Sequence, residues 1–243
     1  MNTQHERAGL ALALALALAS ASSLALSTAA WAGDDKSEDP SLRALSAQWW
    51  QWALSIPAPV NPLAEGTAQG VDVGSRCMVG QRGSVWFLAG TLVGGTVSRK
   101  CSVPAGVTLF FPVVNSVQVN TPGICYQDAA LTVPEMRANV APFIDGVTKL
   151  TVTLDGTAVK AMRRVRSEPF AAALPADNLF VPYCGPGGQP AGVYSPGVDD
   201  GYYVRLEGLK PGPHTLQFTA LNPSAGFDLN MTYQLDVVPV SKR

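Results

Sequence analysis

Three consecutive strand-like segments between Ser84 and Asn120 constrain the fold most. The outer two, 85–88 and 107–114, are apolar on both alternating faces, so neither has a face to turn toward water. Such segments belong in the middle of a sheet or sandwich. The segment between them, 96–103, alternates apolar with polar side chains, which is typical of a strand with one exposed face. The stretch therefore predicts a mainly β protein.

Arg99 interrupts the apolar side of the middle segment, which otherwise carries Val97, Cys101 and Val103. One interpretation places Arg99 at the margin of the sheet, with its methylene stem covered and its guanidinium in water. The other makes it a buried partner of a carboxylate or a bound anion. We expect the position at the margin.

Regular alternation continues in the second half of the chain, at 201–206, 215–220 and 227–237. The strand-like segment 150–154 is followed by Asp155-Gly156, a strong signal for a two-residue hairpin turn. Hydrophobic residues make up 47% of the chain and charged residues 14%, with 23 Gly and 19 Pro, a composition that argues against disorder. We predict an antiparallel β-sandwich of jelly-roll or immunoglobulin-like type, with one or two short covering helices.

The segment 41–55 has helical spacing, with apolar residues three and four positions apart. Ser41 suits the start of a helix, and Pro57 suits its end. At the helical angle Trp49 and Trp52 face the core, whereas Trp50 points elsewhere and is the better candidate for exposure. The three tryptophans are either a sugar-stacking platform or part of the core. We expect the core, because aromatic side chains dominate core burial.

The N-terminus has the pattern of a secretion signal. Arg7 precedes an Ala/Leu-rich run, and Ala30-Trp31-Ala32 has the form of a cleavage site. A membrane anchor is the alternative, but the run is rich in Ala and interrupted by Ser. We expect cleavage after Ala32, no membrane span thereafter, and a secreted or periplasmic protein. The predicted division is a signal peptide at 1–32, a flexible segment at 33–40 and a single β-sandwich domain at 41–243.

Four cysteines in an exported chain predict two disulfides, for which three connectivities exist. Cys77 and Cys101 flank the strand at 84–90, so they can meet across neighbouring strands. Cys125 and Cys184 both lie in loops rich in Pro and Gly, so a bridge between them would join one loop to the other. We favour these two pairs. The chain has no CxxC motif, and we expect neither a metal nor a cofactor.

The charge and the missing motifs exclude several functional classes. A formal net charge of -1 gives no electrostatic basis for binding nucleic acid. The GxSxG, HExxH, Walker and dinucleotide signatures do not occur. We predict instead a binding module whose loops at 115–128 and 171–203 form one surface for a glycan or another neutral polar ligand. The candidate ligand-binding residues are Asn115, Gln118, Asn120, Tyr183, Tyr194, Tyr202 and Tyr203.

Two other interpretations stay open at this point. The alternative function is a carbohydrate-active enzyme, a polysaccharide lyase or glycoside hydrolase, with Asp199, Asp200 or Glu135 as acid and base. In a lyase, a Tyr with a nearby Arg could instead serve as base and charge stabiliser. Glu135 also forms a capping-box pattern with Thr132, which predicts the start of a short helix. The third interpretation is a structural component of the cell envelope with no small ligand. We favour a binding or structural role over an enzymatic one.

Several motifs together resemble an uncharacterised family of secreted bacterial proteins. They are WWQWALSIP at 49–57, VWFLAG at 85–90, RKCSVPAG at 99–106, LFFPVVN at 109–115 and LKPGPHTLQF at 209–218. The resemblance spans most of the chain after the predicted signal peptide. It implies export and a mostly β domain, and it implies no activity and no catalytic residues.

Overall fold

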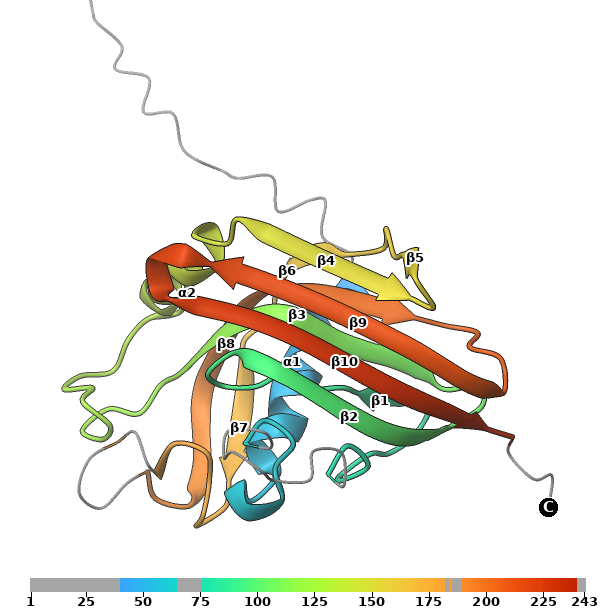
Figure 1. Cartoon of the computed structure of the whole chain (residues 1–243). Coiled ribbons are helices and arrows are strands. Elements are labelled where there is room, and N and C mark those ends of the chain that lie inside the picture. Colours follow the sequence, from blue (N-terminus) through green and yellow to red (C-terminus); the bar gives the residue numbers. More distant parts are fainter. Residues whose placement is uncertain (1–39, 65–75, 182–183, 185–188, 240–243) are drawn as a thin grey trace, which may run out of the picture. The chain divides into compact units, whose positions relative to one another are not determined.

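The computed structural model describes residues 40–64, 76–181, 184 and 189–239 (Figure 1). The predicted signal peptide and Tyr183 lie outside the described residues. The helical elements are α1 (Pro40–Ser55), α2 (Val133–Asp145) and the short 3-10 turns Ala58–Val60 and Pro223–Ala225. The strands are β1 (Val85–Phe87), β2 (Gly95–Pro104), β3 (Thr108–Val119), β4 (Lys149–Leu154), β5 (Thr157–Ala158), β6 (Arg163–Arg166), β7 (Phe170–Leu174), β8 (Gly192–Leu206), β9 (Gly212–Asn222) and β10 (Phe227–Val238). The predicted mainly β fold with few helices is confirmed.

The strands form two sheets, which we name after their central pairs. The β3–β8 sheet has the order β1-β3-β8-β6, and β7 also pairs with β8. The β9–β10 sheet has the order β2-β10-β9-β4-β5 (Figure 1). Most pairings are antiparallel, as predicted. However, β1 pairs with β3 and β2 pairs with β10 in the parallel direction, so both sheets are mixed.

The β3–β8 sheet is covered on both faces, which explains why β3 is apolar on both sides. Phe111 faces the β9–β10 sheet, where its ring stacks on Phe218. Phe110 faces the opposite way, belongs to the cluster that contains the tryptophans of α1, and stacks on Tyr203. Helix α2 contacts β3 and β8 through Met136 and its neighbours. The fully apolar segment therefore lies in the middle layer, as its pattern requires.

Helix α1 begins at Pro40, one residue before the predicted start. Its three tryptophans are all buried, and Trp50 is only 5% exposed, so the predicted exposure of Trp50 is wrong. The indole nitrogen of each ring donates to an acceptor in another segment: Trp49 to the carbonyl of Leu88, Trp52 to that of Val79, and Trp50 to the carboxyl of Asp199. The helix is enclosed on more than one side, so its periodicity alone does not identify an exposed face. Neither described helix is long and apolar enough to cross a membrane.

Arg99 is fully buried, so the predicted position at the sheet margin is wrong. Its guanidinium donates to the carbonyl oxygens of Pro62, Ala89 and Gly90 and to the hydroxyl of Tyr233, at 2.6 to 3.1 Å. Carbonyl dipoles and the Tyr233 ring, 5.6 Å away, compensate the cost of removing this cation from water. Arg99 thereby joins β2 to two connecting segments.

Several local predictions are confirmed. Asp155 and Gly156 form the β4–β5 turn with φ of 51° and 76°, the left-handed values that a two-residue hairpin requires. Thr132 and Glu135 form the predicted capping box at the start of α2. Both favoured disulfides, Cys77–Cys101 and Cys125–Cys184, are present.

The two predicted surface loops are shorter than expected. Strand β3 continues to Val119 and β8 begins at Gly192, so much of 115–128 and 171–203 is strand. Strand β7 occupies a further part of the second range. Proline and glycine residues in these ranges suggested loops, but the hydrogen bonds of the β3–β8 sheet run through them.

Candidate functional site

A buried carboxyl group, that of Asp199, lies between α1 and the β3–β8 sheet. Asp199 is fully buried on β8, and Tyr203 lies on the same face of that strand four residues later. The Trp50 indole donates to the carboxyl at 2.8 Å, and the Tyr203 hydroxyl donates to it at 2.9 Å. Asn115, on the neighbouring strand β3, donates its amide to the Tyr203 oxygen at 3.0 Å. These four side chains form one continuous hydrogen-bonded cluster.

Burial controls the protonation of this cluster. Removal from water raises the pKa of Asp199 well above its ordinary value of 3.8, and the charge of neighbouring Asp200 acts in the same direction. The hydrogen bonds from Trp50 and Tyr203 oppose that shift. Burial also raises the pKa of Tyr203, and the nearby Asp199 adds to this increase. The cluster therefore favours the uncharged forms of both groups.

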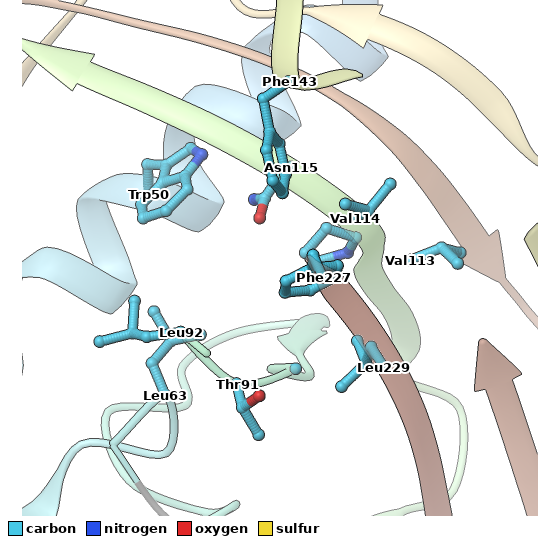
Figure 2. A pocket seen from close by; sticks show the side chains of 12 residues that line it. Trp50, Leu63, Thr91, Leu92, Val113, Val114, Asn115, Phe143, Phe227 and Leu229 are labelled. Atoms are coloured by element: carbon cyan, nitrogen blue, oxygen red, sulfur yellow. The ribbon is translucent and has the colours of Figure 1, made fainter. Parts of the chain in front are cut away.

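A cavity of about 80 Å³ borders this cluster. Trp50 and Asn115 line it together with mostly apolar side chains, among them Leu92, Phe227 and Leu229. Figure 2 shows the Asn115 amide between Trp50 and Phe227, and the aliphatic side chains around the same space. The cavity is too small for a sugar ring, since a cavity that binds benzene measures about 150 Å³.

A larger and more open groove, of about 470 Å³, lies beside the Cys125–Cys184 disulfide. We call it the bridged groove. The end of β3, the segment that follows it, α2 and the region around Phe180 supply its walls. Its lining residues are Val117, Gln118, Val119, Thr121, Cys125, Tyr126, Gln127, Asp128, Ala129, Leu131, Asn139, Phe180 and Gln189.

The segment that follows β3 is held in place by its own amide side chains. Gln127 accepts from the backbone and hydroxyl of Thr121 and donates to Asn120 and to the carbonyl of Ala129. Asn120 in turn exchanges hydrogen bonds with the backbone of Leu131. With the disulfide, these bonds give the groove a wall that is fixed before any ligand binds.

Tyr126 is the most exposed aromatic residue of this wall, at 82%. Its φ is 62° and that of Cys125 is 53°, a left-handed conformation that costs free energy for residues with a side chain. Phe180 lines the same groove. Residues in sparsely populated backbone conformations cluster at functional sites, so Tyr126 marks this groove as a candidate ligand site.

Gln189 lies in another part of the groove wall and is only 1% exposed. Its backbone carbonyl accepts from the Asn178 amide at 2.8 Å, and the Asn178 side chain also accepts from the backbone N–H of Phe180. The side-chain nitrogen of Gln189 is buried and has no hydrogen-bond partner among the described residues. Folding thus leaves one amide donor of the groove unsatisfied.

The structure separates the residues that the sequence suggested as one surface. Gln118 lines the groove, and Asn120 accepts a hydrogen bond from the backbone N–H of Leu131, which is a lining residue. Asn115 and Tyr203 belong to the buried Asp199 cluster. Tyr202 points to the opposite face of β8 and packs on the core between the sheets, while Tyr194 is half-buried and donates to the carbonyl of Pro190.

Sequence reasoning missed Tyr126, Asn139, Phe180 and Gln189. They come from segments far apart in the chain, and only the fold brings them together. The signal that was available is the position of Tyr126 next to Cys125, because a disulfide at a loop fixes its neighbours as well.

The carboxylates considered for catalysis do not form a pair. Glu135 is exposed in the capping box, where hydrogen bonds from Thr132 lower its pKa. Asp200 is bound by Arg164 at 2.8 Å and by Arg166 at 3.4 Å. Asp199 follows the alternation of β8 and points away from Asp200. In the described part of the chain, no three His, Cys, Asp or Glu side chains gather as a metal site would require.

Neither the family models nor the curated proteins include a match to this chain. The resemblance to a family of secreted proteins therefore stays a prediction from the motifs.

Proposed function

We propose that the protein is an exported, non-enzymatic binding module and that the bridged groove is its site for a glycan or another neutral polar ligand. The observation that carries the proposal is the combination of an exposed ring, Tyr126, with amide side chains in a groove of about 470 Å³. A sugar ring has an apolar face of C–H groups and a rim of hydroxyls. The first packs on aromatic side chains, and the second exchanges hydrogen bonds with amides.

The charge of the groove supports a neutral ligand. Among its described lining residues, Asp128 is the one ionised side chain, and none is Lys, Arg or His. Gln118 and Asn139, which bond each other at 3.0 Å, each keep further hydrogen-bonding capacity toward the groove. An anionic ligand would meet no positive charge among the described lining residues and would face the Asp128 carboxylate.

Export is supported by two independent features. The Ala/Leu-rich run followed by Ala30-Trp31-Ala32 has the form of a cleavable signal. Both cysteine pairs are bridged, and disulfides persist in oxidising compartments such as the periplasm and the extracellular space. We therefore place the module outside the cytoplasm.

A glycan array followed by calorimetry on the purified, oxidised protein tests this function. We expect binding of a neutral oligosaccharide, an affinity roughly 10-fold lower for Tyr126→Ala, and a smaller effect for Tyr126→Phe, because the ring is retained. Val93→Ala is the matched control, since Val93 is 61% exposed and is not among the lining residues of the groove. Absence of any glycan ligand, or an unchanged affinity of Tyr126→Ala, would contradict the proposal.

A further inference from the structure

The unsatisfied amide of Gln189 distinguishes the groove from an ordinary polar surface. Gln127 has partners for both ends of its side-chain amide, and Gln118 is bonded to Asn139. Gln189 alone among these lining amides is buried with its nitrogen unbonded. A buried donor without an acceptor is costly, and folded proteins rarely retain one without a reason. A ligand that brings an acceptor provides such a reason.

The side chains of the groove wall limit which kind of acceptor group a ligand can offer to Gln189. A carboxylate would satisfy the Gln189 donor, but it would bring a second negative charge into a groove that already contains Asp128. A hydroxyl oxygen is a weaker acceptor than an amide carbonyl. Val119, Leu131 and Phe180 also line the groove and offer an apolar surface to a methyl group. An acetamido substituent combines a neutral carbonyl acceptor, an N–H donor and a methyl group in one unit.

We propose that the bridged groove selects glycans that carry acetamido groups and that Gln189 donates the hydrogen bond that recognises the acetamido carbonyl. This inference rests on the proposed function of the groove. Gln189 lines the groove but its side-chain nitrogen is buried, so this recognition requires the side-chain amide to rotate toward the bound carbonyl. Asn139, whose amide oxygen accepts no bond from the described residues, is placed on the same wall to accept the acetamido N–H.

A matched pair of ligands isolates the acetamido group. Tetramers of β-1,4-linked N-acetylglucosamine and of β-1,4-linked glucose share their backbone and differ at the 2-position. Calorimetry is expected to show roughly 10-fold tighter binding of the N-acetylated tetramer to the wild type, equivalent to one additional hydrogen bond. The side-chain amide resonance of Gln189 should shift on addition of that tetramer and much less with the glucose tetramer.

Gln189→Met removes the donor at nearly constant volume. We expect this variant to bind the two tetramers with equal affinity, close to that of the wild type for the glucose tetramer. Its melting temperature should be no lower than that of the wild type, because the lost donor had no partner in the folded protein. Gln234→Met, on an exposed position of β10, is the matched control and should retain the preference.

Failure of the acetamido inference can be distinguished from failure of the proposed glycan-binding function. If the wild type binds both tetramers equally, or if Gln189→Met keeps the preference, the acetamido inference is wrong and the groove remains a glycan site. If the wild type binds neither tetramer and no glycan on the array, the proposed function and the inference are both wrong.

Discussion

The Asp199 side chain shows how a single polar group is accommodated inside this protein. It is fully buried, yet Trp50 and Tyr203 donate to its oxygens and Ser167 accepts from its backbone N–H. Burial raises the pKa of this carboxyl group, so it keeps its proton to a higher pH than an exposed carboxyl group does. The cluster therefore joins α1 to the β3–β8 sheet without a buried ion pair.

The raised pKa of Asp199 predicts a specific pH dependence of stability. Above the ordinary carboxyl pKa the unfolded chain releases this proton, whereas the folded protein keeps it until the raised pKa is reached. The contribution of Asp199 to the unfolding free energy is thus complete at low pH. It is lost as the pH rises from the ordinary carboxyl pKa to the raised pKa of the folded protein. We expect Asp199→Asn to flatten the decrease in unfolding free energy that begins as the pH rises above the ordinary carboxyl pKa of about 4.

Urea unfolding of both proteins at several pH values measures this effect. The pKa of His214 is raised by its hydrogen bond to Asp155, so the stability it contributes also falls as pH rises. Because His214 is common to both proteins, the difference between their two curves isolates Asp199. Parallel curves would show that Asp199 keeps an ordinary pKa in the folded state.

Individual burial was the least predictable property of the chain. Trp50 and Arg99 both violate the pattern of their own element, and both are buried through partners that lie elsewhere in the sequence. The burial of Gln189 was equally unpredictable from the sequence, because its segment is rich in Pro and Gly and has no periodicity. Gln118 was predicted as a groove residue because it lies near the end of a strand. The Cys125–Cys184 bridge was predicted because both cysteines lie in segments rich in Pro and Gly.

At the scale of elements, strands β3 and β8 approach each other unusually closely at Gly201. A Cβ atom placed on Gly201 would lie 2.6 Å from the Cβ of Asn115 and 2.8 Å from the carbonyl oxygen of Val114. Since these are atoms of the neighbouring strand rather than the end of a flexible side chain, the strand itself would have to move. Gly201 is therefore required for the pairing that positions Asn115.

Gly201→Ala is expected to destabilise the protein by about 2 kcal/mol, in the range of other overpacking substitutions. Gly192→Ala, on the same strand, is the matched control, because its added Cβ would meet the Tyr194 ring at 3.3 Å and that side chain can adjust. Chemical denaturation compares the two. Equal stability of both variants would mean that β8 shifts without cost at Gly201.

Elements with strong local signals were predictable, and their partners were not. Alternation identified β9 and β10, the Asp155-Gly156 turn identified the β4–β5 hairpin, and Thr132 with Glu135 identified the start of α2. The parallel pairing of β2 with β10 carries no local signal, since it depends on segments at opposite ends of the domain. The first part of β8 was obscured because it includes Pro196 and Gly197, whereas alternation identified its last part, 201–206.

At the scale of the whole molecule, the two disulfides have different roles. Cys101 lies on β2, and Cys77 lies in a segment that Gln81 ties to β1, so their bridge connects the two sheets. Cys125 lines the bridged groove, and its bridge to Cys184 fixes the groove wall. The first disulfide is expected to serve stability alone, and the second both stability and binding.

Paired serine substitutions test this division. Removal of Cys77–Cys101, which closes a separation of 24 residues, should cost roughly 3 to 4 kcal/mol and leave the glycan affinity of the remaining folded protein unchanged. Removal of Cys125–Cys184, with a separation of 59, should cost roughly 4 kcal/mol and also weaken binding. Calorimetry on both variants, below their melting temperatures, measures the difference. An unchanged affinity after loss of Cys125–Cys184 would remove the disulfide from the site.

The pairing of β2 with β10 has a consequence for biosynthesis. Among the described strands, β10 is the sheet neighbour of β2, although β2 leaves the ribosome long before it. A nascent chain therefore cannot complete the β9–β10 sheet until the final strand is available. Translation that stops before Phe227 would leave β2 without its sheet neighbour, so that both of its edges are unpaired, and the product would be prone to aggregation or degradation.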